Sequence, residues 1–165
     1  MDTNNIRPVR LTDAARLAEI YNYYIEHTTV TLELEPITAD EMARRIAEIS
    51  EKYPYFVYES EGRVLGYTYA HPWNTRAGYK GHSLETTIYL DHEAKHGGIG
   101  VVLINHLIEF CRAEGYHALI ANAVDENQES RAFHEKLGFE QVAYYTEVGR
   151  KFNRWLGIKS FEKKL

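Results

Sequence analysis

A glycine-rich turn near the middle of the chain has the composition of an anion-binding site. Ile88-Tyr89-Leu90 has the pattern of a strand, Lys95-His96-Gly97-Gly98-Ile99-Gly100 follows it, and an amphipathic segment begins at once. Glycines let a backbone approach a phosphate, and the first N–H groups of a helix point toward it. The helix dipole favours an anion there by about 0.3–1 kcal/mol, and Lys95 and His96 could add donors. The same turn is also compatible with a tight strand-to-helix connection that binds nothing.

Two well-known phosphate motifs do not fit this turn. No Gly-Lys-Ser/Thr follows at the spacing of a P-loop. A dinucleotide fingerprint requires Gly-x-Gly-x-x-Gly near the start of a first strand-helix-strand unit, whereas this turn lies beyond the midpoint of the chain. The pattern therefore indicates an anion site of another kind, or none.

A second group of polar residues lies in the segment 127–139. Ser130 and His134 are four residues apart, so a helix would place them on one face. Asn127 precedes this helix and could cap it or contact a ligand. His134 could equally be a partly exposed helix histidine, and Gly138 could simply end the helix. Local chemistry leaves these alternatives open.

These segments require a scaffold that mixes helices and strands. Periodicity and capping patterns predict a helix capped by Thr12, a second opened by a capping box at Thr38–Glu41, a glycine-turn helix that buries Val101, and a short helix over 130–136. Strands are predicted at 6–10, 55–60, 63–70, 84–90, 118–123, 139–148 and 153–161, with a hairpin turn at Glu61-Gly62. This order indicates an α/β (α+β) fold in one domain, residues 1–165.

Composition excludes several classes of function. The 165 residues carry a net charge of −5, which gives no field to attract nucleic acid. A single cysteine, Cys111, allows no intramolecular disulfide. The N-terminus shows no signal-peptide pattern, and no apolar run reaches membrane-spanning length. We therefore expect a cytoplasmic protein with neither a nucleic-acid nor a membrane partner. The eight histidines show no convincing metal-ligand spacing, so we expect no metal.

The two motifs together resemble those of the GNAT N-acetyltransferase superfamily. Its members carry Arg/Gln-x-x-Gly-x-Gly before a helix and then Asn-x-x-Ser/Ala-x-x-Leu/Phe-x-x-x-Leu-Gly-Phe, which Asn127 to Phe139 matches. The chain is more similar still to the phosphinothricin and methionine sulfoximine N-acetyltransferases. The resembling segments span nearly the whole chain: Thr29-Val30, Glu35-Pro36, Tyr53-Pro54, Tyr69-Ala70, Pro72-Trp73, Arg76, Tyr79, Glu85-x-Thr87-x-Tyr89, the glycine turn, His134-Glu135, Gly149-x-Lys151 and Trp155.

The resemblance has two departures. Lys95 stands where the family usually has Arg or Gln, so the positive charge is kept but the planar fork of arginine is lost. The segment Thr31-Leu32-Glu33-Leu34 replaces one that carries an aromatic and a basic residue in other members. This segment is expected to help wall the acceptor pocket, so the departure bears on the choice of substrate.

The resemblance implies a central, mixed, mostly antiparallel sheet of about seven strands with about four helices. Two central strands would splay apart to hold acetyl-CoA. Its pantetheine arm would pair with the backbone of Ile88, Tyr89 and Leu90. Its pyrophosphate would meet the amides of residues 96 to 101, which are His96, Gly97, Gly98, Ile99, Gly100 and Val101. Asn127 and Lys136 would contact the far end of the cofactor.

The resemblance also assigns the chemistry. Glu85 matches the proposed base, acting directly or through water, although by itself it would be interpreted as an ordinary solvent-facing or ion-paired strand glutamate. His134 would be an acid or a second base, and a backbone N–H near Tyr89 would stabilise the oxyanion. The acceptor would contact Thr86 and Thr87 and a post-strand loop, with Arg76 gripping a carboxylate; the loop residues are Trp73, Thr75, Arg76, Ala77 and Tyr79.

The expected reaction is acetylation of the α-amine of a small amino-acid-like molecule such as phosphinothricin or methionine sulfoximine. Two alternatives remain open: acetylation of a protein, peptide or polyamine, and a non-catalytic acyl-CoA-binding module. The resemblance further implies a homodimer with the strands of Phe139 to Phe161 near the partner.

Overall fold

The computed structural model describes residues 3–94 and 97–165. Its strands are β1 (Ile6–Pro8), β2 (Tyr55–Ser60), β3 (Arg63–Pro72), β4 (Ser83–Leu90), β5 (Ala118–Val124), β6 (Glu140–Lys151) and β7 (Arg154–Lys164). Its α-helices are α1 (Ala14–His27), α2 (Ala39–Ser50), α3 (Ile99–Ala113) and α4 (Gln128–Lys136), and short 3₁₀ turns cover Thr3–Asn5 and Leu11–Asp13. The predicted number and order of the elements are confirmed for the residues described.

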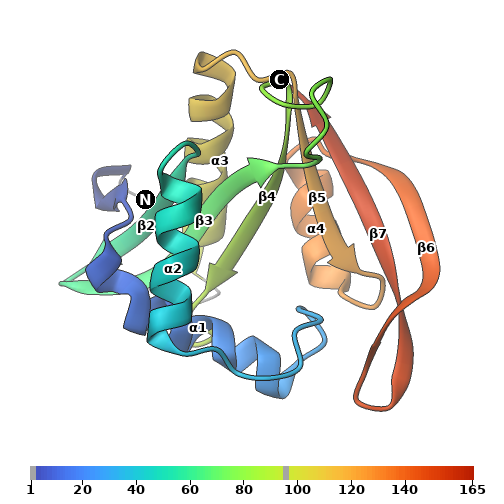
Figure 1. The fold of residues 1–165 in the computed structure, drawn as a ribbon, viewed down its shortest axis with the longest axis horizontal. Coiled ribbons are helices and arrows are strands. Elements are labelled where there is room, and N and C mark those ends of the chain that lie inside the picture. Colours follow the sequence, from blue (N-terminus) through green and yellow to red (C-terminus); the bar gives the residue numbers. More distant parts are fainter. Residues whose placement is uncertain (1–2, 95–96) are drawn as a thin grey trace.

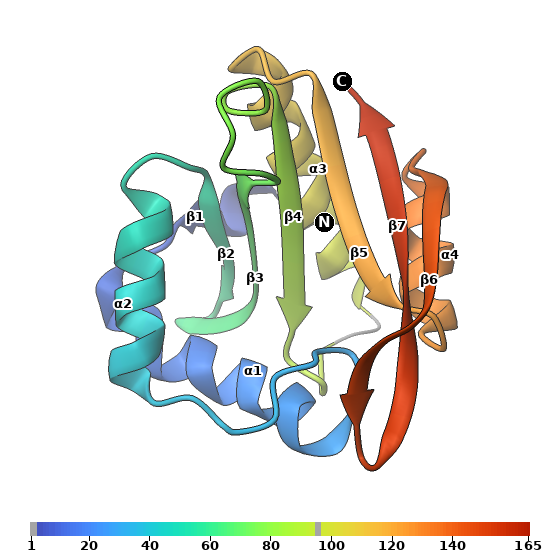
Figure 2. The same cartoon turned by 45° about the vertical axis from the view of Figure 1, so that its right-hand side comes forward.

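The strands form one sheet in the order β1-β2-β3-β4-β5-β7-β6 (Figures 1 and 2). Every neighbouring pair is antiparallel except β4 and β5, which are parallel. The predicted fold class, a mixed and mostly antiparallel sheet, is therefore confirmed.

Helices cover both faces of the sheet, and strand alternation explains how. In β2, Tyr55 and Val57 join the core beneath α1 and α2, whereas Phe56 and Tyr58 join the core beneath α3. Successive strand side chains point to opposite faces, so a strand that is apolar at every position is buried on both sides. Phe133 of α4 and Leu137, which follows the helix, pack on the α3 side. Within the part of the chain that is described, no helix is long and apolar enough to cross a membrane.

The centre of the sheet is split between β4 and β5. Their ladder runs only from Ser83 opposite Ala118 to Thr86 opposite Ala121. Beyond that rung, β4 stays paired with β3 as far as Leu90, and β5 stays paired with β7 as far as Val124. Figure 2 shows the two strands diverging below their paired ends. The predicted splay of the central strands is thus present.

Several local predictions need correction. Thr12 does not cap α1, because residues 11–13 form a 3₁₀ turn in which the Asp13 carboxylate accepts from the Arg10 N–H at 2.8 Å. The Thr38 hydroxyl does accept from the Glu41 N–H at 3.1 Å, but the Glu41 carboxylate binds Arg44 and Arg45 at 2.8 Å.

The last hairpin is longer than predicted. The strands β6 and β7 extend to Lys151 and Lys164, and they are joined by Phe152 and Asn153 in the left-handed conformation, with φ of 49° and 62°. A turn with two positive φ values matches the twist of the strands that flank it. The earlier turn at Glu61 and Gly62, with φ of 52° and 77°, has the predicted form.

Candidate active site

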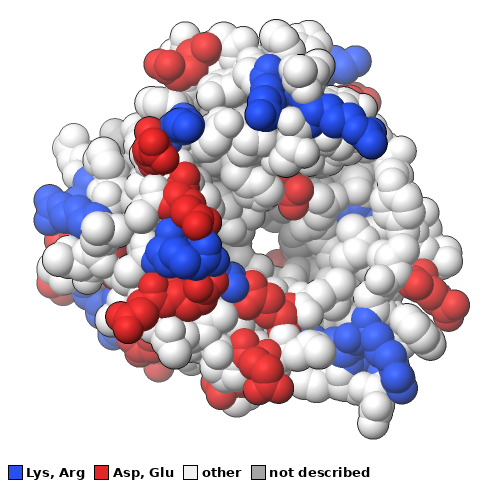
Figure 3. Space-filling view, viewed as in Figure 1, with Lys and Arg blue, Asp and Glu red and all other residues white. Residues whose placement is uncertain are grey.

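Two pockets lie along the split between β4 and β5. The first, which we call the α3 pocket, has a volume of about 220 Å³ and is lined by the start of α3, α4, β4 and Tyr24 of α1. The second, the strand pocket, has a volume of about 280 Å³ and lies between β4 and β5. They form one continuous cleft, because six residues line both: Val30, Ile88, Tyr89, Asn127, Ser130 and His134. The space-filling view shows an opening in this region (Figure 3).

The start of α3 gives the α3 pocket its polar end. Gly98 precedes the helix in the left-handed conformation, with φ of 74°, which glycine adopts without strain. A Cβ on Gly100 would lie 3.2 Å from Leu90 and 3.4 Å from Phe133, so glycine lets the helix approach β4 and α4 closely. As in any helix, the first N–H groups have no acceptor within the helix. The glycine turn therefore presents donors to the pocket.

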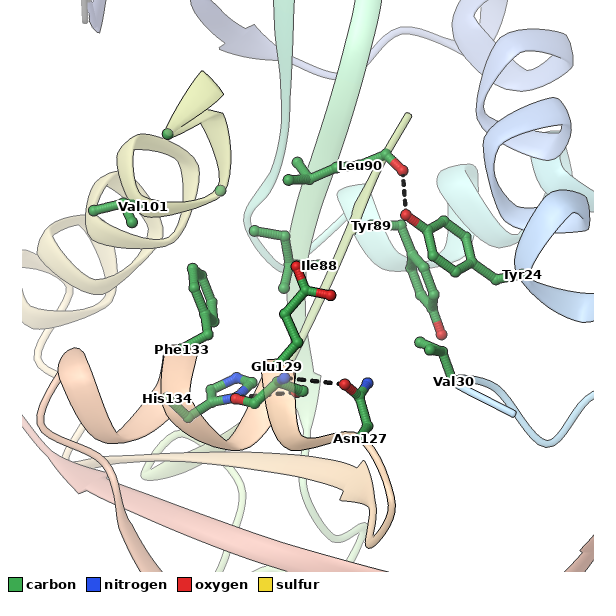
Figure 4. A pocket seen from close by; sticks show the side chains of 13 residues that line it. Tyr24, Val30, Ile88, Tyr89, Leu90, Val101, Asn127, Glu129, Phe133 and His134 are labelled. Atoms are coloured by element: carbon green, nitrogen blue, oxygen red, sulfur yellow. Dashed lines mark hydrogen bonds between the residues drawn. The ribbon is translucent and has the colours of Figure 1, made fainter. Parts of the chain in front are cut away.

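The walls of the α3 pocket are mainly apolar. Figure 4 shows Ile88 and Leu90 of β4 facing Val101 and Phe133 across the space. Val101 is half-buried rather than buried as predicted, because it faces this pocket instead of the core. The Tyr24 hydroxyl donates to the Leu90 carbonyl at 2.6 Å and so fixes the end of β4 (Figure 4).

The α4 helix places Asn127 and His134 at the junction of the two pockets. Asn127 caps α4, since its side-chain oxygen accepts from the Ser130 N–H at 3.0 Å (Figure 4). It also lines both pockets, so the capping and ligand-contact interpretations are compatible.

The surroundings of His134 favour its neutral form. Its Nδ1 lies 2.8 Å from the Ser130 carbonyl oxygen, and because a carbonyl can only accept, Nδ1 carries the hydrogen. Its ring is 5% exposed and stacks on Phe161. This burial lowers the pKa of His134. The remaining nitrogen, Nε2, is therefore a proton acceptor.

Glu85 lies on the other side of the sheet from His134. Along β4, Glu85, Thr87 and Tyr89 share one face, and Tyr89 packs on Tyr21 of α1 with ring centroids 4.8 Å apart. Glu85 is half-buried and lines the strand pocket. Among the described residues it has no ion-pair partner, so it is not the ion-paired strand glutamate that the sequence left open.

The two threonines next to Glu85 differ in their surroundings. Thr86 is buried, and its hydroxyl donates to the Ile120 carbonyl at 3.3 Å, so it reinforces the last β4–β5 rung before the split. Thr87 lines the strand pocket on the face of Glu85, beside the hydroxyl of Tyr69.

The predicted acceptor loop stands apart from the cleft. Trp73 and Tyr79 pack edge to face with centroids 5.2 Å apart, and the Arg76 N–H donates to the Asn74 side chain at 3.0 Å. None of the loop residues predicted to bind the acceptor lines either pocket, and all are exposed; they are Trp73, Thr75, Arg76, Ala77 and Tyr79.

Three predicted cofactor residues lie elsewhere or are not described. Lys136 is exposed at the end of α4 and lines neither pocket. Lys95 and His96 lie outside the described residues. The neighbouring glycine-turn residues are described; of these, Gly98, Gly100 and Val101 line the α3 pocket.

Several residues that line the two pockets were not predicted from the sequence as site residues. Tyr24 and Glu129 line the α3 pocket, and Asn122 to Val124 and Ile158 line the strand pocket. Only the helical face shared by Tyr21 and Tyr24 gave a signal, and it indicated burial alone. The segment 31–34 was expected to wall the site, and Thr31 and Leu32 of that segment line the strand pocket.

Comparison with known proteins agrees with the fold and the motifs. The model of the acetyltransferase (GNAT) domain family matches residues 6–157. The chain is 34% identical to the phosphinothricin N-acetyltransferase of Streptomyces viridochromogenes over 158 residues, which cover 96% of this chain and 86% of that protein. It is 33% identical to the L-methionine sulfoximine/L-methionine sulfone acetyltransferase of Pseudomonas paraeruginosa over 156 residues, covering 93% and 90%.

Solved structures are equally similar. The phosphinothricin acetyltransferase of Sinorhizobium meliloti in complex with AcCoA superimposes with a TM-score of 0.92 at 34% identity, covering 97% of this chain and 87% of that one. The ribosomal-protein-alanine N-acetyltransferase of Brucella melitensis gives 0.93 at 33% identity, covering 97% and 99%. Sequence, fold and cleft thus lead to one assignment: the chain is a member of the GNAT acetyltransferase family.

Proposed function

We propose that the chain transfers the acetyl group of acetyl-CoA to the α-amine of a small amino-acid-like acceptor, such as phosphinothricin or methionine sulfoximine. One observation carries the proposal: a continuous cleft passes between β4 and β5, with the α3 N-terminus and His134 on one side and Glu85 on the other. Two substrates can therefore meet from opposite faces of the sheet. The relatives named for phosphinothricin and methionine sulfoximine support this acceptor class.

The residues of the α3 pocket fit acetyl-CoA. The start of α3, where Gly98 and Gly100 line the pocket, suits a pyrophosphate because the first N–H groups of a helix point toward an anion there. The β4 edge beyond Thr86 has no β5 partner, so its backbone groups are available to an amide-containing arm. Val101 and Phe133 supply apolar surface for the same arm. We infer that Asn127, and not the exposed Lys136, meets the cofactor within the pocket.

On the acceptor side, the amine must lose a proton before it attacks. An α-amine with a pKa of about 8 is only about one tenth neutral at pH 7. The Glu85 carboxylate accepts that proton, directly or through water, while the amine nitrogen bonds to the thioester carbon. The developing negative charge on the carbonyl oxygen is stabilised by a backbone N–H near Tyr89.

On the cofactor side, His134 is the one ionisable imidazole among the described residues that line both pockets. The C–S bond breaks as the C–N bond forms, and the sulfur leaves as a thiolate that a proton later neutralises. Burial favours the neutral form of His134, and in that form the hydrogen on Nδ1 is bound to the Ser130 carbonyl, so His134 is poorly placed to supply that proton at the start of a turnover. The sequence left His134 two possible roles, acid or second base. We therefore favour the second base, which first takes a proton from the amine and only then can pass one to the thiolate.

The test is acetyl-CoA-dependent thiol release with a panel of amines: methionine sulfoximine, phosphinothricin, common amino acids, polyamines and a short peptide. Turnover with the first two alone supports the proposed acceptor. Turnover with polyamine or peptide alone replaces the acceptor but keeps the reaction. Acetyl-CoA binding without turnover on any amine would favour the non-catalytic acyl-CoA-binding module.

A protein N-terminus is the second candidate acceptor, and one observation favours it. The loop of Arg76 is exposed, and none of the residues predicted to bind the acceptor in it lines the strand pocket. A peptide acceptor needs an open groove, and the Brucella melitensis relative is named for a ribosomal protein. Peptides that begin with alanine therefore belong in the amine panel.

We also propose a homodimer formed through the β6–β7 hairpin. Large apolar side chains are about half exposed along it: Val142, Tyr144, Tyr145, Val148, Phe152 and Trp155. A patch of this kind marks an interface more often than free surface. Sedimentation should show a dimer that Trp155→Lys converts to monomers, and a monomeric wild-type protein at micromolar concentration would contradict it.

We further propose that residues 1–165 act as one catalytic domain in the cytoplasm. The match of one GNAT domain to residues 6–157 supports the single domain. Cell fractionation with an antibody to the native protein tests the compartment, and recovery in a membrane or secreted fraction would contradict it.

A further inference from the structure

The connection between α1 and α2 walls the cleft without any regular structure of its own. Residues 28–34, which we call the strap, contain no helix or strand. Val30 lines both pockets, and Thr31 and Leu32 line the strand pocket. Figure 2 shows the strap passing beside the tip of the β6–β7 hairpin. Something outside the strap must hold it in place.

Lys151, the last residue of β6, supplies one such contact. Its ammonium donates to the Thr31 carbonyl at 2.9 Å, although the residues are 120 positions apart in sequence. Lys151 is 3% exposed, and no carboxylate lies within ion-pair distance of it in the described part of the chain. Burial lowers the pKa of Lys151. The Glu33 carboxylate acts on this ammonium only from beyond ion-pair distance, and the ammonium also lies 5.2 Å from the centre of the Phe152 ring. Since a buried ammonium is unfavourable unless it is hydrogen-bonded, the bond to Thr31 is a main interaction that holds Lys151 in place.

The Thr31 contact reaches the aromatic wall of the cleft. The Thr31 hydroxyl lies 2.8 Å from the Tyr21 hydroxyl, and burial raises the pKa of Tyr21 to about 12. The Tyr21 ring in turn packs on Tyr89, which lines both pockets. Lys151 therefore acts through Thr31 on the surface that faces Glu85.

Other contacts hold the strap at neighbouring points. A Cβ on Gly149 would lie 2.4 Å from Leu32, so β6 and the strap touch directly. Thr29 hydrogen-bonds Glu126, which also binds Arg154 of β7 at 2.6 and 2.7 Å. On the other side, Arg45 of α2 pairs with Glu33 at 2.5 Å. Of these tethers, that of Lys151 is the most deeply buried and ends on a pocket-lining residue.

We propose that Lys151 is a positioning residue for acceptor binding, because its ammonium fixes Thr31 and so the strap that walls the acceptor side of the cleft. The inference rests on the proposed function for its acceptor side. It makes Lys151 distinct from Glu85 and His134, since it touches neither the acceptor nor acetyl-CoA.

The test compares Lys151→Met, Lys151→Arg and the control Lys159→Met. Lys159 lies on the same hairpin over the ring of Tyr144 and lines neither pocket. Losing a hydrogen bond from a charged donor should raise the acceptor KM about tenfold in Lys151→Met. The Kd for acetyl-CoA should change less than twofold, and Lys151→Arg should recover part of the loss. An unchanged acceptor KM, or an equal loss of acetyl-CoA affinity, would overturn the proposal.

A second readout does not depend on activity. Amide hydrogen exchange at residues 30–33 should be at least tenfold faster in Lys151→Met than in the wild type or Lys159→Met. If the wild type acetylates no amine, the proposed function fails while exchange still tests the tether. If Lys151→Met does not fold, Gly149→Ala displaces Leu32 from the other side and should raise the acceptor KM alone. Unchanged exchange in Lys151→Met, or an unchanged KM in Gly149→Ala, would contradict the tether.

Discussion

The two sides of the cleft are built in different ways. The α3 side is assembled mainly from two short segments: the end of β4 with the glycine turn, and a short helix whose cap, Asn127, lies seven positions before His134. The acceptor side is assembled from distant ones, since the strap is held by Lys151, Glu126 and Arg45. Local motifs specify most of the first side, although Tyr24 and Val30 also line the α3 pocket. The second exists only once the whole chain has folded, so it can diverge in substrate choice while the first is kept.

The largest expected effect is a loss of turnover on the acceptor side that leaves acetyl-CoA binding on the α3 side intact. Glu85→Gln removes the proposed base without changing shape, so kcat should fall roughly 100-fold or more. Acetyl-CoA affinity should be unchanged, because Glu85 faces away from the α3 pocket. Thiol-release kinetics and calorimetry measure the two quantities. Glu162→Gln, a β7 glutamate that lines neither pocket, is the control. Full activity of Glu85→Gln across the pH range would remove Glu85 from the reaction.

A substitution on the α3 side should weaken acetyl-CoA binding and leave acceptor binding unchanged. In Gly100→Val, the Cβ alone would lie 3.2 Å from Leu90 and 3.4 Å from Phe133, and the two methyl groups need further space. Overpacking of about 2 kcal/mol corresponds to roughly a thirtyfold loss of acetyl-CoA affinity. The acceptor KM at saturating acetyl-CoA should be little changed. Asn105→Val, at an exposed position of α3, controls for helix propensity. Loss of acceptor binding in equal measure would show that the two sides are not separable.

The same contrast explains what the sequence could predict. The glycine turn, the α4 cap and the seven strands follow from local patterns: Gly98 adopts a positive φ, Asn127 accepts from Ser130, and alternating strands bury both faces. The resemblance to a known family added the splay between β4 and β5, which the structure contains, and the role of Glu85 as base, which remains a proposal. Local reasoning went wrong where a distant side chain intervened, as when Arg7 bound Asp13 at 2.8 Å and the 3₁₀ turn displaced Thr12 as a cap.

The strap shows why the remaining contacts of the site could not be predicted from the sequence. No spacing in the sequence relates Lys151 to Thr31, because their contact depends on how the last hairpin lies against the α1–α2 connection. The Tyr24 contact with the Leu90 carbonyl is similar, since it joins a helix to a strand 66 positions later. Such contacts arise from tertiary packing, which period and propensity do not encode.

The β3–β4 loop offers a way to sharpen the comparison on the acceptor side. If Arg76 moves onto the acceptor carboxylate, Arg76→Ala should raise the KM for carboxylate acceptors about tenfold and leave that for acetyl-CoA unchanged. Methyl esters of the same acceptors should show no difference between Arg76→Ala and the wild type. If the KM for acid and ester rises equally, or not at all, the acceptor carboxylate is held elsewhere and the strap becomes the main determinant of specificity.

The smallest expected effect concerns the buried imidazole on the α3 side. Burial lowers the pKa of His134 in the folded protein, so the unfolded chain takes up a proton first as the pH falls below about 6.5. The stability contributed by neutral His134 is therefore present above that pH and is lost as the pH falls toward the folded pKa. His134→Phe keeps a ring against Phe161 but cannot titrate, so its unfolding free energy should fall less between pH 7 and pH 5 than that of the wild type.

Urea unfolding at several pH values measures this difference. His106, whose pKa burial also lowers, contributes in the same direction and is present in both proteins, so the comparison isolates His134. His117→Phe, at an exposed position before β5, controls for the substitution itself. Parallel pH profiles for His134→Phe and the wild type would mean that His134 is protonated as readily in the cleft as in water. It could then donate a proton to the leaving thiolate at the start of a turnover, and the assignment of His134 as a second base would be wrong.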